Sequence, residues 1–511
     1  MRKITILTTV ALLLVGGSAT AAIPRTEAQR TIEAVCAREP LRSSLVGVLA
    51  IGPGGDTLVS VNPVRKLTPA SNVKLLTTGM ALHTLGADYR FETRLAYTGE
   101  IVDGTLTGDL YIVGGGDPTI GARTDCAAAL SKTFGEWAAI LAKAGITRIG
   151  GRVLGDPRFF SDPTPQNLGW TFDDLGANYG AGPQGLNFFE NAQNIYVTPG
   201  TLGQKPGFRV QYPDTPWMRY ANHAVTGAAR SANTLYYVNT ALAPFGEIAG
   251  SFPVDRRGYT LECTNAYAAY TCAWYFRNYL ENNGVRVDGG WGDITLQGEI
   301  RTDLTPGMPL SPAASPEEFI LLGTALSAPL SEIARDTNCE SDNFYAETLL
   351  RMVAWKAGLL ADQHACRDAA EATLRAMGLR PDNACQQFDG SGLSRKNYVS
   401  PAFFVRFLRK MATLPAWDAF LASLPVPGGK GTLEFSFRDA PQEYKDRIHM
   451  KSGSMNGVRC YSGYILPADG DASRAVTFSL MVNNCTASSY IVGPIIEEIL
   501  AAIVDSGSSP E

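Results

Sequence analysis

The sequence has few of the residues on which metal sites and nucleic-acid surfaces depend. Only four of its 511 residues are histidines, and none has a second histidine at helical spacing or a CxxC pair beside it. Because zinc sites usually gather their ligands at such short spacings, no metal is expected. The net charge of −5 and the pI near 5.6 give no basic excess, so no nucleic-acid partner is expected either. Nothing in the sequence calls for a cofactor.

Long apolar runs are missing after the N-terminus. The one near the start, Ile4–Val15, follows Arg2 and Lys3 and precedes small residues up to Ala21. It is far shorter than the roughly 20 residues that span a bilayer, so the pattern favours a signal peptide over a membrane anchor. We expect residues 1–21 to be removed by cleavage near Ala21, which predicts an exported, periplasmic protein. The later run 491–504 contains two glutamates and predicts an amphipathic helix, so the mature chain should have no transmembrane segment.

Cysteines, by contrast, are present: nine of them follow the predicted signal peptide. Export would place them where disulfides persist, although spacing alone does not fix connectivity and an odd number leaves at least one thiol free. The candidate pairs by proximity are Cys263/Cys272, Cys366/Cys385 and Cys460/Cys485.

The length of the chain predicts more than one domain, because single cores stop growing near about 250 to 300 residues. Residues 26–85 show the pattern helix, strand, strand, helix, with Ser71 in the first turn of the second helix. Strand-like patterns with glycine-rich turns fill 89–320, apart from a helical pattern over 266–282. Helical periodicity returns after residue 327, and 458–465 and 475–482 predict antiparallel strands.

Three short motifs occur in order along the chain: Ser71–Lys74, Ser341–Asn343 and Lys451–Ser454. Each by itself is common, since the first is typical of a capped surface helix, the second of an N-cap and the third of a turn. All three in this order, with the first at a helix start and the last entering a strand, favour a catalytic site. SxxK, SDN and KTG form the signature of class A β-lactamases and penicillin-binding proteins.

The chemistry of these residues fits nucleophilic catalysis. Lys74 lies one helical turn after Ser71 and is therefore expected to take its proton, while the helix N-terminus and a second cation, Lys451, are expected to lower the pKa of Lys74. Ser341 is placed to relay a proton to the leaving amine, and Asn343 to hold the substrate backbone.

The third motif supplies groups for substrate binding. Lys451 and Ser452 offer a cation and a hydroxyl to a terminal carboxylate. After Gly453, the backbone N–H of Ser454 is expected to form an oxyanion hole with that of Ser71.

Longer runs resemble one family. Residues 89–120, 341–347, 389–395 and 453–458 are similar to segments of the carboxypeptidase/endopeptidase family that includes penicillin-binding protein 4. One departure is Ser452, where the family usually has threonine, which keeps the hydroxyl. The 270 residues that separate Ser71 from Ser341 (341 − 71) agree with the large insertions for which the family is known.

The resemblance implies an α/β (α+β) fold: a serine β-lactamase/DD-transpeptidase-like catalytic domain with large, mostly β insertions. We expect the catalytic domain to comprise residues 22–88 and 321–511, an inserted domain 89–195 and 259–320, and a nested second insertion 196–258.

The activity implied is that of a serine D-Ala-D-Ala carboxypeptidase and DD-endopeptidase, which acts on peptidoglycan peptides through an acyl-enzyme on Ser71 and is inhibited by β-lactam antibiotics. Asp174 falls where the family has an acidic residue that faces the substrate's diamino acid; Asp173 is the alternative alignment, and a solvated loop aspartate the alternative role. Other hypotheses are a β-lactamase or esterase on the same scaffold, and a non-catalytic peptidoglycan-binding or β-lactam-sensing protein. Replacement of Ser71, Lys74 or Lys451 would favour the last, and all three are present.

Overall fold

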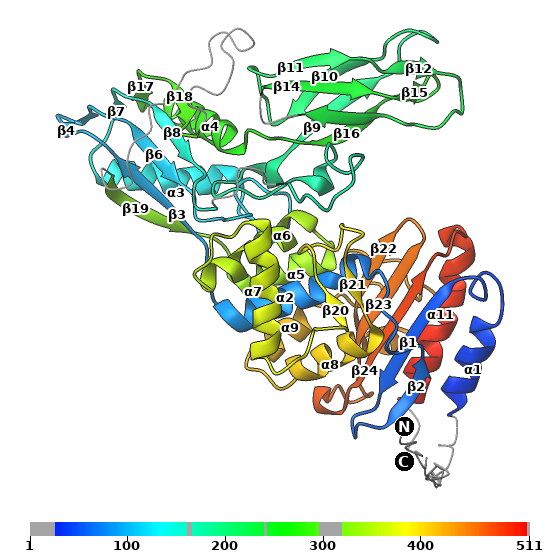
Figure 1. The fold of residues 1–511 in the computed structure, drawn as a ribbon. Helices are drawn as coiled ribbons and strands as arrows, with labels where there is room; N and C mark the ends of the chain where they lie inside the picture. Colours follow the sequence, from blue (N-terminus) through cyan, green and yellow to red (C-terminus); the bar gives the residue numbers. More distant parts are fainter. Residues whose placement is uncertain (1–25, 161–165, 240–242, 296–318, 508–511) are drawn as a thin grey trace, which may run out of the picture.

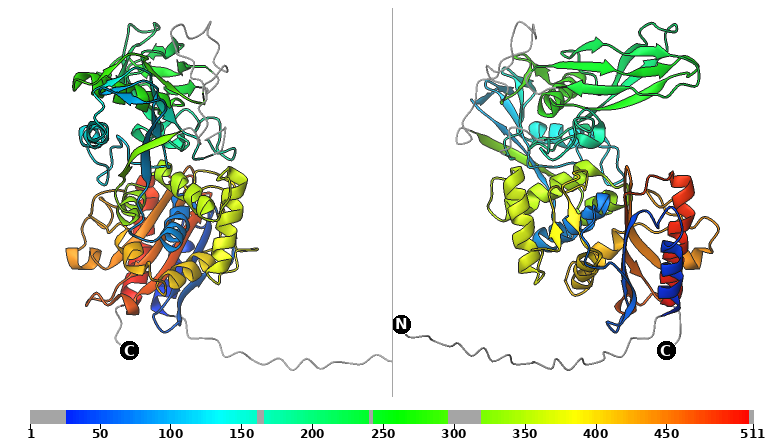
Figure 2. Two further views of the ribbon diagram at one scale, coloured as in Figure 1. Left: turned by 90° about the vertical axis from the view of Figure 1, so that its left-hand side faces the viewer. Right: turned by 45° about the vertical axis from the view of Figure 1, so that its right-hand side comes forward.

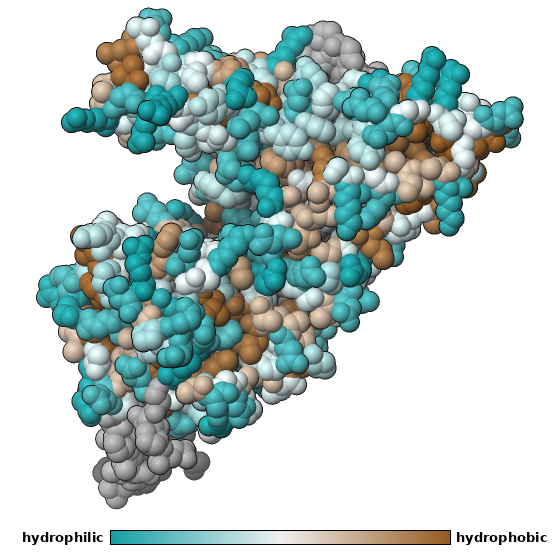
Figure 3. All heavy atoms as spheres, turned by 180° about the vertical axis from the view of Figure 1, so that it is seen from behind, coloured by the Kyte–Doolittle hydropathy of each residue, from teal (hydrophilic) through white to brown (hydrophobic). Residues whose placement is uncertain are grey.

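The computed structural model describes residues 26–160, 166–239, 243–295 and 319–507. Two parts are stacked on one another: the lower one carries both ends of the chain, and the upper one is formed by the middle of the sequence (Figure 1 and Figure 2). Seen from behind, the surface is hollowed where the upper part overhangs the lower (Figure 3). Within the described residues, no helix is long and apolar enough to cross a membrane. The predicted signal peptide lies outside them.

The lower part is built on an antiparallel five-stranded sheet. In spatial order its strands are β2 (Thr57–Val61), β1 (Leu45–Ile51), β24 (Val476–Asn483), β23 (Val458–Ile465) and β22 (Ile448–Met455). Helices α1 (Glu27–Cys36) and α11 (Ser489–Ser506) cover one face. Every residue of β24 is buried, the polar Thr477, Ser479 and Asn483 included, because this central strand has helices on both faces.

The other face of the sheet is covered by a helical layer that shares one core with Cys460, Tyr464 and Met481 of the strands. Its helices are α2 (Val73–Leu85), α5 (Leu330–Cys339), α6 (Asn343–Lys356), α7 (Gln363–Ala376), α8 (Pro401–Met411) and α9 (Trp417–Ala422). Smaller elements of this part are the turn η1 (Ala70–Asn72), the strands β20 (Cys385–Gln386) and β21 (Tyr398–Val399), the helix α10 (Gln442–Lys445) and the turn η5 (Ala472–Arg474). Helix α2 is central to the layer, and ten of its residues are buried.

The upper part contains two sheets with helices α3 (Leu130–Lys143) and α4 (Ala268–Asn282). The first sheet has the order β18 (Trp291–Asp293), β8 (Val153–Asp156), β6 (Leu110–Val113), β3 (Glu92–Tyr97), β19 (Ile320–Leu326), and the second the order β17 (Arg286–Val287), β7 (Arg148–Ile149), β5 (Thr105–Leu106), β4 (Ile101–Val102). Because β19 pairs with β3 from Ile320 to Leu326, the predicted boundary after residue 320 falls inside a strand. The domain division itself stays a proposal.

Smaller sheets extend from the upper part over the lower one (Figure 1). They are formed by β10 (Gly207–Tyr212), β9 (Ala192–Thr198) and β16 (Tyr259–Thr264); by β11 (Arg219–Asn222), β14 (Phe245–Ala249) and β13 (Tyr236–Asn239); and by β12 (Val225–Gly227) and β15 (Ser251–Pro253). The turns η2 (Asn178–Gly180) and η3 (Phe189–Asn191) precede β9. Pairing of β9 with β16 brings together the two ends of the segment expected as a nested insertion.

The candidate disulfides were wrong: all nine cysteines lie among the described residues and are free thiols. The reason is that residues close in sequence lie on different elements and turn their sulfur atoms toward local carbonyls. The thiol of Cys263 donates to Leu261 O (3.4 Å), that of Cys366 to Ala361 O (3.7 Å) and that of Cys460 to Thr68 O (3.5 Å).

Candidate active site

Ser71 lies in η1, immediately before α2, and not in the first turn of the α-helix itself. Lys74 follows in the first turn of α2, and its Nζ lies 3.1 Å from Ser71 Oγ. Ala70, directly before the serine, has a φ of +48°, a left-handed conformation that non-glycine residues adopt only where their surroundings hold it. The turn therefore presents Ser71 in a fixed orientation beside the lysine.

The third motif lies on β22, which runs directly along this turn. A Cβ on Gly453 would lie 2.7 Å from Pro69 O and 3.1 Å from Ser71 N, so only glycine fits there. On either side of it, Ser452 Oγ donates to Thr432 Oγ1 (2.9 Å) and Ser454 is exposed. Lys451 is fully buried, and its Nζ donates to Ser452 O (2.8 Å).

Lys74 is held by two further acceptors. Its Nζ donates to Asn343 Oδ1 and to Ser391 O, each at 2.7 Å. Complete burial lowers the pKa of Lys74 to about 8, and the carboxylates of Asp342, Asp389 and Glu347 only partly oppose this. The sequence-based prediction had the right direction for this pKa, but it named the helix N-terminus and Lys451 as causes, whereas burial is the cause.

The two lysines nevertheless influence each other. Burial is also the main reason why the pKa of Lys451 lies well below its ordinary value, and repulsion by Lys74 adds to it. Buried amines of this kind lose protons more readily than exposed ones.

The second motif links α5 to α6. Asp342 caps α6 by accepting from Tyr345 N (2.8 Å), and this cap fixes Asn343 as the first residue of the helix. Asn343 Nδ2 donates to Tyr179 O in the upper part (3.0 Å). Ser341 has a φ of +59°, and its hydroxyl makes no hydrogen bond with the described residues, so the structure does not join it to Lys74 or Ser71.

The loop 389–395 supplies the Ser391 carbonyl to Lys74, a role that the sequence does not predict. Asp389, fully buried, accepts from Gly392 N (2.8 Å), Ser394 N (2.6 Å) and the indole of Trp170 (3.0 Å). Glu347 on α6 accepts from Ser391 N (2.8 Å). These bonds orient the loop toward Lys74. The only sequence signal for it was the run Asp389–Arg395, used for the resemblance alone.

A pocket of about 320 Å³ opens at Ser71. Its lining includes Ser71, Asp174, Tyr179, Asn343, Arg395 and Ser454. Asp174 thus faces the same pocket as the serine, with Oδ2 accepting from Thr171 Oγ1 (2.6 Å), whereas the neighbouring Asp173 is exposed and lies outside the lining. Of the two aligned aspartates, the geometry favours Asp174. Among the described residues, no cluster of three or more His, Cys, Asp or Glu side chains is arranged to hold a metal ion.

Comparison with known proteins agrees with this geometry. Residues 28–497 match the D-Ala-D-Ala carboxypeptidase 3 (S13) family. A D-alanyl-D-alanine carboxypeptidase of Actinomadura sp. (strain R39) is 30% identical over 480 residues, which cover 90% of this chain and 81% of the relative.

Solved structures share the fold. Penicillin-binding protein 4 of Haemophilus influenzae superposes with a TM-score of 0.76 at 22% identity, covering 94% of this chain and 99% of that one. Its complex with a β-lactam superposes with a TM-score of 0.70 at 20% identity, over 94% and 100% of the two chains. Since the family match extends over nearly the whole described chain, the protein belongs to the D-Ala-D-Ala carboxypeptidase 3 (S13) family and is a serine peptidase.

Proposed function

We propose that this carboxypeptidase cleaves D-Ala-D-Xaa bonds of peptidoglycan peptides by acyl transfer, with Ser71 as nucleophile and Lys74 as its base. The observation that carries the proposal is the 3.1 Å contact between Lys74 Nζ and Ser71 Oγ, made by a fully buried amine with a pKa of about 8. A base is most effective when its pKa lies near the working pH.

The contacts of Lys74 also decide which way its lone pair points. Asn343 Oδ1 and Ser391 O only accept hydrogen bonds. A neutral amine has two N–H groups, and both stay on these oxygens. The remaining lone pair then faces Ser71 Oγ, where it takes the hydroxyl proton.

The reaction that we propose uses residues of the three motifs. Ser71 Oγ attacks the peptide carbonyl, and the backbone N–H groups of Ser71 and Ser454 stabilise the negative oxygen. The C–N bond breaks, and the leaving amine takes the proton that Lys74 removed from Ser71. Relay of this proton through Ser341 requires its hydroxyl to turn toward Lys74, since it makes no hydrogen bond with the described residues. Water then hydrolyses the acyl-enzyme. Asn343 holds the peptide backbone, while Lys451 and Ser452 bind the terminal carboxylate.

The same chemistry extends to cross-linked peptides, in which the leaving amine belongs to a second peptide, so DD-endopeptidase activity is part of the proposal. Inhibition by β-lactams is included because they present a strained amide to the same serine; the Haemophilus influenzae relative has been solved with a β-lactam. Export to the periplasm through the signal peptide at 1–21 would bring the enzyme to its substrate.

The experiment that tests the proposal is mass spectrometry of the intact and digested protein after incubation with a penicillin. We expect one stable acyl adduct, located on Ser71, and none in Ser71→Ala. An adduct on another residue would refute the assignment of the nucleophile. Rapid turnover of the drug would indicate a β-lactamase.

A second prediction concerns Asp174. If its carboxylate meets the ammonium of the substrate's diamino acid, Asp174→Asn should reduce kcat/KM about ten- to a hundredfold, since a charge-assisted hydrogen bond contributes roughly 1.5 to 3 kcal/mol. The loss should be confined to peptides with a free side-chain amine and should spare N-acetylated peptides and penicillin.

The matched control for Asp174 is Asp173→Asn, which removes a negative charge from the adjacent residue, outside the pocket lining. Equal losses on both kinds of peptide would mean that Asp174 supports the fold. An effect of Asp173→Asn alone would favour the alternative alignment.

A further inference from the structure

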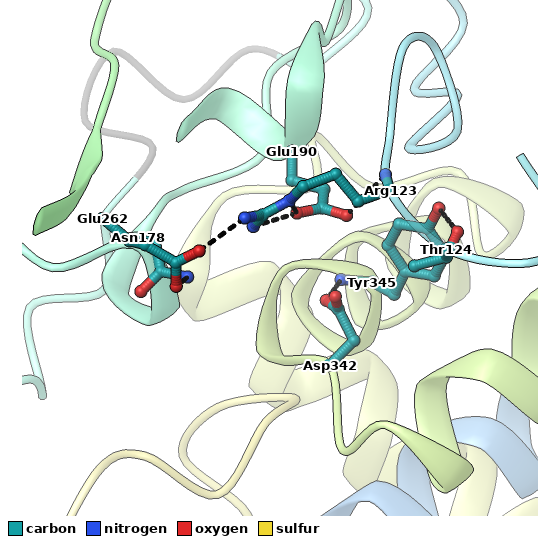
Figure 4. Close-up of polar contacts among 7 residues, drawn as sticks. All are labelled: Arg123, Thr124, Asn178, Glu190, Glu262, Asp342 and Tyr345. Atoms are coloured by element: carbon teal, nitrogen blue, oxygen red, sulfur yellow. Dashed lines mark hydrogen bonds and ion pairs between the residues drawn. The ribbon is translucent and has the colours of Figure 1, made fainter. Parts of the chain in front are cut away.

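Arg123, in the loop between β6 and α3, joins two segments of the upper part (Figure 4). Its guanidinium donates to Glu190 Oε2 from Nε (3.2 Å) and Nη2 (2.8 Å), and to Glu262 Oε1 from Nη1 (2.7 Å). Glu190 lies in η3 and Glu262 in β16. A planar guanidinium with several fixed donors is suited to hold two carboxylates in one geometry.

From Glu262 the contacts continue to the pocket. Glu262 Oε2 accepts from Asn178 Nδ2 (3.1 Å), and the next residue, Tyr179, accepts from Asn343 Nδ2 through its carbonyl (3.0 Å). Asp174 belongs to the same compact turn, because Ala177 N donates to Asp174 O (3.2 Å). The contact of Glu262 with Asn178 therefore also fixes the position of the Asp174 carboxylate, which lines the pocket.

The neighbouring residue anchors the same loop to α6. Thr124 Oγ1 lies 2.6 Å from the hydroxyl of Tyr345, whose backbone N–H donates to Asp342. The loop of Arg123 is thus connected to Asn343 by two routes. One passes through Thr124 and Tyr345. The other passes through Asn178 and Tyr179. The contacts around Arg123 form a closed ring that includes the second catalytic motif.

Charge and backbone strain are concentrated at Glu190. Figure 4 shows the carboxylate of Asp342 pointing toward the Glu190–Arg123 pair, and Arg123 opposes the repulsion that Glu190 exerts on Asp342. Phe189, Glu190 and Asn191 all have positive φ, of 52°, 56° and 50°. Three successive non-glycine residues keep such a conformation only when their contacts hold them, and strain of this kind clusters at functional sites.

We propose that Arg123 is a positioning residue for substrate specificity, which fixes Asp174 relative to Ser71 through Glu262 and Asn178. The inference rests on the proposed function, in which Asp174 binds the substrate's side-chain amine. Arg123 itself lies outside the pocket lining and acts only through the turn that it holds.

The test is the ratio of kcat/KM for amine-bearing and N-acetylated peptides, measured together with the rate of Ser71 acylation by a penicillin. Arg123→Gln should lower this ratio about tenfold, within the hundredfold that a misplacement of ~1 Å can cost, and leave penicillin acylation within about twofold of the wild type. Arg123→Lys keeps one cationic contact, so its ratio should lie between those of the wild type and Arg123→Gln. Asn178→Ala removes the hydrogen bond to Glu262 without removing a charge. It should lower the ratio by the same factor even if Arg123→Gln folds poorly.

A double mutant separates positioning from general damage. In an Asp174→Asn background, Arg123→Gln should not lower the ratio further, because residues that act through one path are not additive. The matched control is Arg152→Gln, which breaks a comparable two-contact pair with Asp109 elsewhere in the upper part and should leave the ratio unchanged.

The outcomes against the proposal are distinct from failure of the proposed function. An unchanged ratio in Arg123→Gln and Asn178→Ala, or a loss that is fully additive with Asp174→Asn, would overturn the positioning role while Ser71 is still acylated normally. A wild-type enzyme that penicillin does not acylate at Ser71 would instead refute the proposed function.

Discussion

Replacing Lys74 with alanine is expected to slow acylation of Ser71 by about 10² to 10⁴-fold, the range that a positioned general base contributes. Within the described residues, Lys74 is the one whose side chain hydrogen-bonds to Ser71 Oγ, so no other amine replaces it. The measurement is the second-order rate of penicillin acylation, followed by mass spectrometry. Near-normal acylation in a folded variant would remove Lys74 from the mechanism.

The control for this experiment concerns the fold. Lys74→Ala leaves Asn343 Oδ1 and Ser391 O without their donor. Ser391 is fully buried, and a buried acceptor left unpaired costs about 1 to 3 kcal/mol. Lys74→Gln retains an amide donor and no basic amine. If both variants unfold at temperatures close to that of the wild type and both acylate slowly, the loss is chemical.

The pH dependence of the wild type follows from the same residue. Because the pKa of Lys74 is about 8, the amine carries a proton below that pH and cannot accept the one on Ser71. Acylation should therefore rise with pH and level off above about pH 8. In Lys74→Ala the rise of the acylation rate near pH 8 should be absent.

Gly392→Ala is expected to reduce acylation about a hundredfold without removing any reacting group. A Cβ at Gly392 would lie 1.9 Å from Ala70 O and 3.0 Å from Ser71 N, so either the loop or the turn that carries Ser71 must move. Displacements of ~1 Å near reacting atoms are enough for such a loss.

Gly378→Ala is the matched control. Gly378 also has a positive φ, 82° against 86° at Gly392, but a Cβ at Gly378 would meet no atom within 4 Å beyond its own chain neighbours. Alanine there causes only backbone strain and the associated loss of stability, so acylation should stay normal. Equal acylation rates in both variants would show that the contact between the loop and the turn is unimportant for Ser71.

Local elements could be predicted from the sequence because their periodicity is local. The helical pattern at 266–282 corresponds to α4 and the strand patterns at 458–465 and 475–482 to β23 and β24. The three motifs also indicated which residues meet, and Lys74 does contact Ser71 and Asn343. The catalytic roles of these residues stay predictions until the variants are measured.

The contacts that hold the site in place were not predictable in this way. Trp170 and Asp389 lie 219 residues apart, and Arg123 and Glu262 lie 139 apart, so neither pair leaves a pattern in any short window. The same limitation misled the cysteine pairing, because nearness in sequence says little about which element a thiol faces. Lys74 likewise donates to Asn343 of α6 and to Ser391 of the loop 389–395, which lie 269 and 317 residues away in sequence.

In the five-stranded sheet of the lower part, strands from the two ends of the chain are paired, and this affects when the enzyme becomes active. Strand β1 is paired with β24, and Thr68 N, just before the nucleophile, donates to Asn483 Oδ1 across 415 residues of chain. This contact cannot form until Asn483 has been synthesised, and pairing between such distant segments is slow. The turn that carries Ser71 is therefore among the first segments to be synthesised and among the last to gain its supports, so an incomplete chain carries the nucleophile without the means to use it.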